Sequence, residues 1–253
     1  MVSTALYSRV VASFGAGTAP TAVDAVIELA RCFGAELQAV LLEDVLTLAL
    51  SEMPAPRTFD TRSAVWRDLQ PTQLHEEMEL AASLLRRRLE TAQAIGVQAR
   101  FTVVRGGAAA ALVGDAQADD LLVIVEPDDA MARWVQPFAG LLDAALAAPS
   151  TVLYLPHRGR TRDGPVAVLG SSPATRELGR RLAQSLGAPL VAVEGDAALP
   201  GQTLHALLPL LRARRVRLVV CERAALAADA RQALHEAGDQ RVAVLLAPES
   251  ARG

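Results

Sequence analysis

A short sequence pattern that occurs twice limits what this chain can fold into. Residues 34–40 read GAELQAV and residues 187–193 read GAPLVAV, so both copies share Gly-Ala-x-Leu-x-Ala-Val. Each copy lies one predicted helix after an apolar strand that runs into a glycine, at Gly15 and at Gly170. Strand, helix and strand with a short return form a βαβ unit, whose strands are parallel. Chance similarity between βαβ units is the alternative, but the shared order and turn glycines favour two related α/β units that arose by duplication.

Short apolar runs predict the strands of both halves, and 3.6-residue periodicity predicts the helices between them. The predicted strands are 9–14, 37–42, 97–104, 121–125 and 151–155 in the first half and 166–169, 190–193, 218–221 and 242–246 in the second. Besides the helix after each first strand, the predicted helices are 76–94, 108–116, 138–147, 204–212 and 224–237. Residues 51–75 interrupt this alternation with several prolines and predict a long excursion that carries Trp66, whose role is left open.

The basic, glycine-containing stretch from His157 to Gly164 separates the two halves. A solvated charge run is more often an exposed tether than an anion site. We therefore expect a complete α/β domain at residues 1–156, a linker at 157–164 and a shortened α/β domain at 165–253. The second domain lacks counterparts of the long helix and the third strand of the first.

Charge and composition exclude several classes of function. The formal net charge of −3 predicts neither a nucleic acid nor an anionic membrane as partner. All 25 basic residues are Arg, as in a bacterial genome of high GC content, so a P-loop lysine or a Schiff-base lysine is impossible. No apolar run reaches the ~18 residues of a membrane span, and the N-terminus shows no signal-peptide pattern. Cys32 and Cys221 lack metal-ligand spacing and are expected to be free thiols, which is consistent with the cytoplasmic location that we expect.

Several short motifs resemble the universal stress protein family in sequence and in order. The two openings are Val11–Ala16 (VASFGA) and Val166–Ser171 (VAVLGS), and Glu43-Asp44 and Val104-Arg105-Gly106 follow the second and third predicted strands. The resemblance implies a flavodoxin-like or adenine-nucleotide α-hydrolase-like α/β fold, with an open parallel sheet of order 3-2-1-4-5 that is shortened in the second half. Because dimers of the family commonly form through the fifth strand, it also implies an intrachain pseudo-dimer. The strands at its interface would be Thr151–Leu155 and Val242–Leu246.

The departures from the family pattern concern its ATP site. ATP-binding members carry an aspartate at the end of strand one, where this chain has Phe14 and Leu169. They also carry a Gly-x-x-Gly loop after strand four, where glycine N–H groups approach phosphate oxygens. Here that position reads Glu126-Pro127-Asp128-Asp129, and the second half shows no glycine between Cys221 and Gly238. Proline has no N–H to donate and the carboxylates repel phosphate, so we expect no ATP and no other cofactor.

Open α/β sheets bind ligands at the carboxyl ends of their strands. A cleft there would suit a neutral or cationic ligand, such as a nucleoside, better than ATP. Its lining residues would be Phe14, Gly15, Asp44, Arg105 and Glu126. The acidic loop after the fourth strand could hold Mg²⁺, but helix capping by aspartate is the favoured interpretation. The four histidines show no metal or catalytic spacing, and no Gly-x-Ser-x-Gly motif is present, so no catalytic residue is assigned.

These observations predict a non-catalytic regulatory or interaction protein of the universal stress protein type, without the family's usual ATP binding. The expected partner is an unidentified protein, and self-association into a homodimer is left open. One alternative is a nucleotide-binding or nucleoside-binding stress-response module. A nucleotide hydrolase is the least favoured alternative, because no paired acid and base is evident in the sequence.

Overall fold

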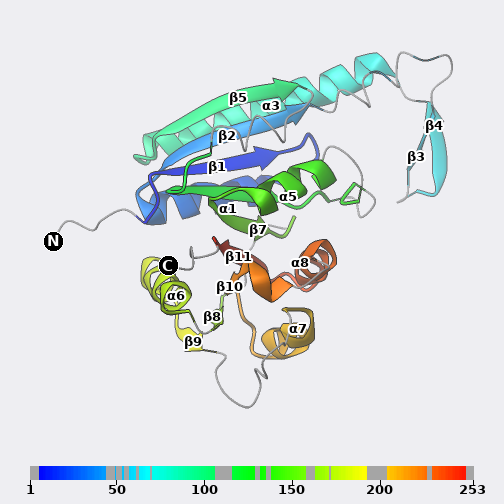
Figure 1. The fold of residues 1–253 in the computed structure, drawn as a ribbon. Coiled ribbons are helices and arrows are strands. Elements are labelled where there is room, and N and C mark those ends of the chain that lie inside the picture. The colour runs from blue at the N-terminus through cyan, green and yellow to red at the C-terminus, as the bar shows by residue number, and fades with distance from the viewer. Residues whose placement is uncertain are drawn as a thin grey trace.

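Nine strands form one continuous sheet in the part of the chain that the structure describes (Figure 1). The structure is a computed structural model. It describes residues 6–43, 49, 53, 57–60, 63–68, 70–105, 116–128, 132–134, 138–157, 163–170, 172–192, 204–226 and 230–248. The order of the strands across the sheet is β5-β2-β1-β6-β7-β11-β10-β8-β9.

The first half of the sheet is parallel throughout. Its strands are β1 (Arg9–Phe14), β2 (Glu36–Glu43), β5 (Ala99–Arg105), β6 (Asp120–Val125) and β7 (Thr151–Leu155). β1 pairs with β2 on one side and with β6 on the other, so the chain reverses its direction of travel across the sheet between these two strands. Every residue of β6 is buried, because helices cover both faces of the sheet.

The second half joins the first through β7 and β11. Its strands are β8 (Val166–Leu169), β9 (Leu190–Ala192), β10 (Leu218–Glu222) and β11 (Ala243–Ala247). β11 runs antiparallel to β7, with Leu245 opposite Leu153, and every other pairing in the large sheet is parallel. Outward from this pair, the order is β7-β6-β1-β2-β5 on one side and β11-β10-β8-β9 on the other. The two sides therefore mirror each other, except that the described part of the second has no counterpart of β5.

Helices cover both faces of the sheet and bury one apolar stripe each. On one face lie α1 (Pro20–Phe33), α3 (Pro71–Ala94) and α6 (Pro173–Ser185). On the other face lie α5 (Phe138–Ala147), α7 (Leu204–Ala213) and α8 (Ala230–Asp239). In α1 the buried positions recur at helical spacing, and the helix ends where Gly34 adopts a φ of 63°, a conformation that glycine enters without strain.

A separate hairpin precedes α3 and stands apart from the large sheet (Figure 1). Its strands are β3 (Arg57–Asp60) and β4 (Val65–Asp68), which pair antiparallel with Phe59 opposite Trp66. The two rings lie 5.3 Å apart between centroids, and both are about half exposed. The sequence predicted a long excursion here but not the hairpin within it.

The predicted α/β class with an open, mostly parallel sheet is confirmed. Three details differ from the prediction. Both sets of strands belong to one sheet, α3 begins at Pro71 rather than at Glu76, and the helix predicted over 224–237 is a 3₁₀ turn, η1 (Arg223–Leu226), and then α8. The helix predicted over 108–116 lies outside the described residues except for Ala116, which is not helical. Among the described helices, none has the length and apolar character needed to cross a membrane.

Candidate functional site

The turn after β1 lies where the chain changes its direction of travel across the sheet, the usual ligand site of open parallel sheets. The backbone N–H of Gly15 donates to Thr18 Oγ1 at 2.9 Å, and the N–H of Thr18 donates to the Gly15 carbonyl at 3.1 Å. The next helix opens with Pro20, which has no N–H. The turn is therefore closed by its own hydrogen bonds, and the Gly15 N–H is already engaged by a side chain.

A small hollow of about 60 Å³ lies beside this turn, between α1 and α3. Its lining residues are Gly15, Ala16, Thr18, Pro20, Val23, Ala81, Leu84, Leu85 and Arg88. Arg88 is held by Asp24, with both carboxylate oxygens within 2.8 Å of Nη1. Pockets for small organic ligands usually span roughly 300–1,000 Å³, so this hollow is several times too small for a nucleoside.

Among the five residues predicted to line one cleft, the structure describes the positions of Phe14, Gly15 and Glu126, and it does not bring Glu126 beside Phe14. Phe14 is 1% exposed and packs in the core layer under α1 and α3, whereas Glu126 points to the opposite face, where it bonds with Tyr154. Arg105 ends β5 opposite Glu43, at the outer edge of the sheet, and its side chain lies outside the described residues. Asp44 also lies outside them. Among the described members of the predicted set, Gly15 lines the hollow beside α1.

The corresponding turn of the second half is occupied by a carboxylate. Gly170, after β8, adopts a φ of 126°, and a Cβ there would lie 3.5 Å from Glu222 Oε1. Thr175, in the first turn of α6, donates its hydroxyl to the same oxygen at 3.3 Å. A negative charge near the N-terminus of a helix is favoured by the helix dipole. Glu222 therefore supplies, from within the chain, the negative charge that a bound anion would bring to this turn.

A buried polar network lies at the junction of the two halves and involves Glu126. Its carboxylate accepts hydrogen bonds from Tyr154 Oη at 2.8 Å and from the backbone N–H of His157 at 3.4 Å. Arg133 approaches Glu126 Oε1 at 3.1 Å and Asp239 of α8 at 2.6 Å, so it links the two halves. Burial raises the pKa of Glu126, and the contacts with Tyr154, Arg133 and His157 oppose that shift.

The second half contributes His235 of α8 to this network. Nδ1 of His235 lies 3.0 Å from Tyr154 Oη, and the indole of Trp134 packs edge-on to the imidazole with ring centroids 4.5 Å apart. Nε2 of His235 is buried and has no hydrogen-bond partner among the described residues. Burial, and then the charge of Arg133, lowers the pKa of His235. Burial also raises the pKa of Tyr154, so the phenol keeps its proton. Nothing in the sequence pattern singled out this histidine.

A second junction contact is made by Arg223, directly after β10. Its guanidinium donates to the carbonyls of Leu146 at 2.8 Å, Ser150 at 2.6 Å and also Ala148. These carbonyls lie at or just beyond the C-terminal end of α5 in the other half, where a positive charge is favoured. Glu126, directly after β6, and Arg223, directly after β10, thus both take part in the contacts that hold the two halves together.

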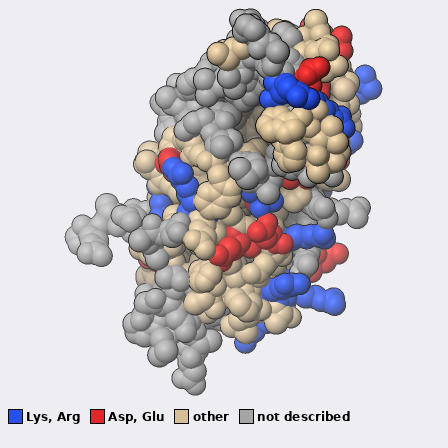
Figure 2. Space-filling model, turned by 90° about the vertical axis from the view of Figure 1, so that its right-hand side faces the viewer, with Lys and Arg blue, Asp and Glu red and all other residues tan. Residues whose placement is uncertain are grey.

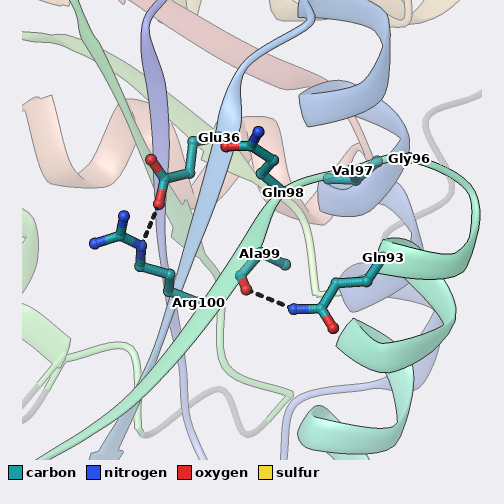
Figure 3. A pocket seen from close by; sticks show the side chains of 7 residues that line it. All are labelled: Glu36, Gln93, Gly96, Val97, Gln98, Ala99 and Arg100. Atoms are coloured by element: carbon teal, nitrogen blue, oxygen red, sulfur yellow. Dashed lines mark hydrogen bonds and ion pairs between the residues drawn. The ribbon is translucent and has the colours of Figure 1, made fainter.

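A shallow hollow of about 350 Å³ lies at the amino ends of β2 and β5 (Figure 3). Arg100 pairs with Glu36 at 2.6 Å, and Gln93 donates its side-chain amide to the Ala99 carbonyl at 2.9 Å. These polar groups bind one another. The hollow is therefore a surface depression remote from the strand ends where ligands of such sheets bind.

Charged groups elsewhere give no sign of a metal or of nucleic acid. Among the described residues, no three His, Cys, Asp or Glu side chains are grouped in a way that could hold a metal ion. Figure 2 shows acidic and basic side chains interspersed on the side of the molecule that carries the carboxyl ends of β1, β2 and β5. The described residues on that side form no broad field of a single sign.

Comparison with known proteins gives matches at the level of structure. No family model and no curated protein matches the chain. A universal stress protein from Archaeoglobus fulgidus DSM 4304 matches with a TM-score of 0.59 and 11% identity, over 96% of this chain and 97% of its own. A protein assigned as a universal stress protein from Pseudomonas aeruginosa UCBPP-PA14 matches with a TM-score of 0.57 and 12% identity, over 96% and 94%.

A functionally unknown protein from Pseudomonas aeruginosa PAO1 matches with a TM-score of 0.56 and 12% identity, over 96% of this chain and 93% of its own. Because these matches span nearly the whole of each chain, both halves of this protein have counterparts in them. The predicted resemblance is confirmed at the level of the fold. The chain has the universal stress protein fold.

Proposed function

We propose that this protein is a non-catalytic regulatory or interaction protein with the universal stress protein fold, and that it does not bind ATP by the usual route of the family. One observation carries the proposal: in both halves, the turn after the first strand is occupied by the chain's own side chains. The hydroxyl oxygen of Thr18 accepts a hydrogen bond from the backbone N–H of Gly15, and the carboxylate of Glu222 lies over Gly170. Both turns thereby resist a polyphosphate.

The energetic argument is strongest in the second half. A phosphate that approached Gly170 would meet the Glu222 carboxylate, which Thr175 holds in place. Two like charges about 4 Å apart at an effective dielectric constant near 20 repel by roughly 4 kcal/mol before screening by salt. In the first half the obstacle is space, since the hollow beside Gly15 holds only about 60 Å³.

The buried polar groups also support a role without catalysis. One cluster among the described residues combines an acid, a hydroxyl and an imidazole, from Glu126, Tyr154 and His235. These residues are 4% exposed or less and are joined by hydrogen bonds, from Tyr154 to Glu126 and between Tyr154 and His235. A substrate has no access to them in this arrangement. Their hydrogen bonds connect the two halves, which is a structural role.

The proposal extends to the organisation of the chain. The mirrored strand order on the two sides of β7 and β11 supports a tandem duplication with units at 1–156 and 165–253, joined by residues 157–164. The two halves would then form an intrachain pseudo-dimer.

Free cysteines at positions 32 and 221 accord with a cytoplasmic location, where thiols stay reduced. The partner that we propose is another protein, bound through the surface of this scaffold.

Calorimetric titration of the ligand-stripped protein with ATP and Mg²⁺ tests the proposal, with adenosine as a second ligand. A universal stress protein that retains the strand-one aspartate and the Gly-x-x-Gly loop serves as the positive control. We expect heat from the control and none from this protein at millimolar ATP. Binding with a Kd below about 100 µM, or release of ADP during incubation, would overturn the proposal.

Two variants then identify which contact excludes the nucleotide. Thr18→Ala frees the Gly15 N–H, and Glu222→Gln removes the charge over Gly170 while it keeps the side-chain volume. If the occupied turns exclude phosphate, Glu222→Gln gains a measurable stabilisation from millimolar inorganic phosphate that the wild type lacks. If neither variant responds to phosphate, the turns do not exclude anions through these contacts.

A further inference from the structure

The junction between the two halves contains a continuous chain of buried hydrogen bonds that ends at a histidine. Tyr154 of β7 lies between Glu126, 2.8 Å away in its own half, and His235 of α8, 3.0 Å away in the other half. All three residues are at most 4% exposed. Gly238 of α8 allows this approach, because the Glu126 carboxylate occupies the space that a side chain at 238 would need.

The direction of the hydrogen bonds determines the protonation state of His235. An ionised Glu126 only accepts, so the Tyr154 hydroxyl donates to it and can then accept a hydrogen bond from His235. Nδ1 of the imidazole must therefore carry a proton. In the neutral ring Nε2 is then a bare lone pair, and the structure gives that atom no partner among the described residues. The arrangement suits a neutral imidazole.

We propose that His235 is a proton-operated lock between the two halves: the neutral imidazole holds α8 against the first half, and protonation of Nε2 releases it. The added proton would sit on a buried nitrogen without an acceptor and would place a second positive charge close to Arg133. A buried donor that lacks an acceptor destabilises the folded state, and a charged donor does so more strongly. Outward movement of α8 would relieve both penalties. This inference does not depend on nucleotide binding.

Other charged groups around His235 do not offset that penalty. The groups that face it are Tyr154 from β7, Arg133 and Trp134 from the segment after β6, Phe138 from α5, and Arg231 and Asp239 from α8 itself. Glu126 is engaged by Tyr154, Arg133 and His157, and Asp239 pairs with Arg133 while its side chain is 65% exposed. Burial and the charges of Arg133 and Arg231 all lower the pKa of His235, and only Asp239 raises it.

The sign of the pH effect follows from linkage. The folded-state pKa of His235 lies below the value of 6.5 for a free imidazole, so near pH 6 the unfolded chain binds a proton that the folded chain does not. The stability contributed by neutral His235 is therefore complete above pH 6.5 and is lost as pH falls toward the folded-state pKa. Glu126 acts in the opposite direction because its pKa is raised, so the effect of His235 must be measured against a variant.

Two measurements on the full chain test the lock. NMR titration of the histidine side chains reports the state of His235 in the wild type directly. Hydrogen exchange, corrected for its intrinsic pH dependence, reports the opening of α8 relative to β1 and β2. The matched variants are His235→Gln, which removes the titrating group, and His205→Gln, which removes an exposed histidine of α7 that pairs with Glu236 of α8.

The lock predicts that His235 is neutral at pH 6.5, with its proton on Nδ1. It predicts that exchange of the α8 amides accelerates by up to about tenfold per pH unit below pH 6.5, the limit for one linked proton, while β1 and β2 change less. His235→Gln abolishes this acceleration and His205→Gln retains it. The proposal is overturned if His235 titrates at an ordinary pKa, if α8 does not respond, or if both halves open together. Should His235→Gln fail to fold, the wild-type titration and exchange data decide the question alone.

Discussion

Gly238 of α8 lies directly against the carboxylate of Glu126, which follows β6 more than a hundred residues earlier in the chain. A Cβ at position 238 would lie 2.7 Å from the Glu126 carboxyl carbon and closer still to Oε1. Real Cβ atoms essentially never approach other atoms so closely. The carboxylate cannot easily retreat, because Tyr154 and Arg133 hold it. The packing of the second half on the first therefore requires glycine at this position.

The variant Gly238→Ala is expected to lower the free energy of unfolding by about 1–3 kcal/mol. Overpacking of a filled site costs this much, although alanine gains up to about 1 kcal/mol of helix propensity over glycine. Urea denaturation followed by circular dichroism measures the change. The control is Gly17→Ala, where a Cβ meets no atom within 4 Å. Equal stability of wild type and Gly238→Ala would show that α8 does not pack on Glu126 this closely.

A similar relationship holds between Gly179 of α6 and Val168 of β8. A Cβ at 179 would overlap Val168 Cγ2 and lie 3.6 Å from its Cβ. We expect Gly179→Ala and Val168→Ala each to cost about 1–3 kcal/mol, the first by overpacking and the second by leaving a cavity. In the double variant the new methyl fills the space that valine leaves, so the combined loss should fall short of the sum by at least about 1 kcal/mol. If the two losses of stability simply add in the double variant, positions 179 and 168 are not in contact.

Arg223 is expected to contribute strongly to the stability of the junction. Arg223→Ala leaves the carbonyls of Leu146, Ala148 and Ser150 without this donor, which we expect to cost about 2–3 kcal/mol. Arg223→Lys should restore only part of the loss, because one ammonium group cannot reproduce the planar fork of a guanidinium. Arg212→Ala, at an exposed position in the last turn of α7, is the control. Full recovery of stability in Arg223→Lys would mean that the positive charge alone stabilises the junction.

The pH dependence of stability should differ between the wild type and Glu126→Gln. Burial raises the folded-state pKa of Glu126 above its usual value of 4.5, so the folded chain binds a proton before the unfolded chain does. The stability of the wild type relative to the variant should therefore rise as pH falls through the folded-state pKa and level off below about pH 4.5.

Urea midpoints from pH 8 to pH 4 measure this difference. Glu28→Gln, which alters an exposed carboxylate paired with Arg31, is the matched control and should follow the wild type. If the urea midpoints of wild type and Glu126→Gln differ by the same amount at every pH from 8 to 4, the Glu126 carboxyl group does not change its protonation on unfolding.

Much of the fold was predictable from the sequence because local patterns suffice for it. Apolar runs marked the strands, and the boundaries of β1, β7 and β8 match the prediction to the residue. Gly34 ends α1 in the left-handed conformation that glycine favours at helix ends. The parallel pairing of β1 with β2 followed from their short βαβ connection. The hairpin of β3 and β4 was missed because its residues carry no apolar alternation and bury little.

The candidate site was predictable only in part. Glu126 stands out in the sequence, but in the structure its side chain does not share a cleft with Phe14. Residues at the ends of neighbouring strands face the same side only if the register between those strands allows it. Here Phe14 and Glu126 fall on opposite faces. The role of Glu222 could have been suspected, since it occupies the position of Glu126 in the repeat.

The sequence by itself determined the class of fold, the shared Gly-Ala-x-Leu-x-Ala-Val pattern and the absence of a Gly-x-x-Gly motif directly after β6, because these depend on residue type and on spacing along the chain. Only the tertiary structure decided that β7 meets β11, that Glu222 covers Gly170, and that Tyr154 joins Glu126 to His235. These contacts connect residues 28 to more than 80 positions apart. Strand register and helix packing decide which residues meet in these contacts, and neither can be predicted from a local stretch of sequence.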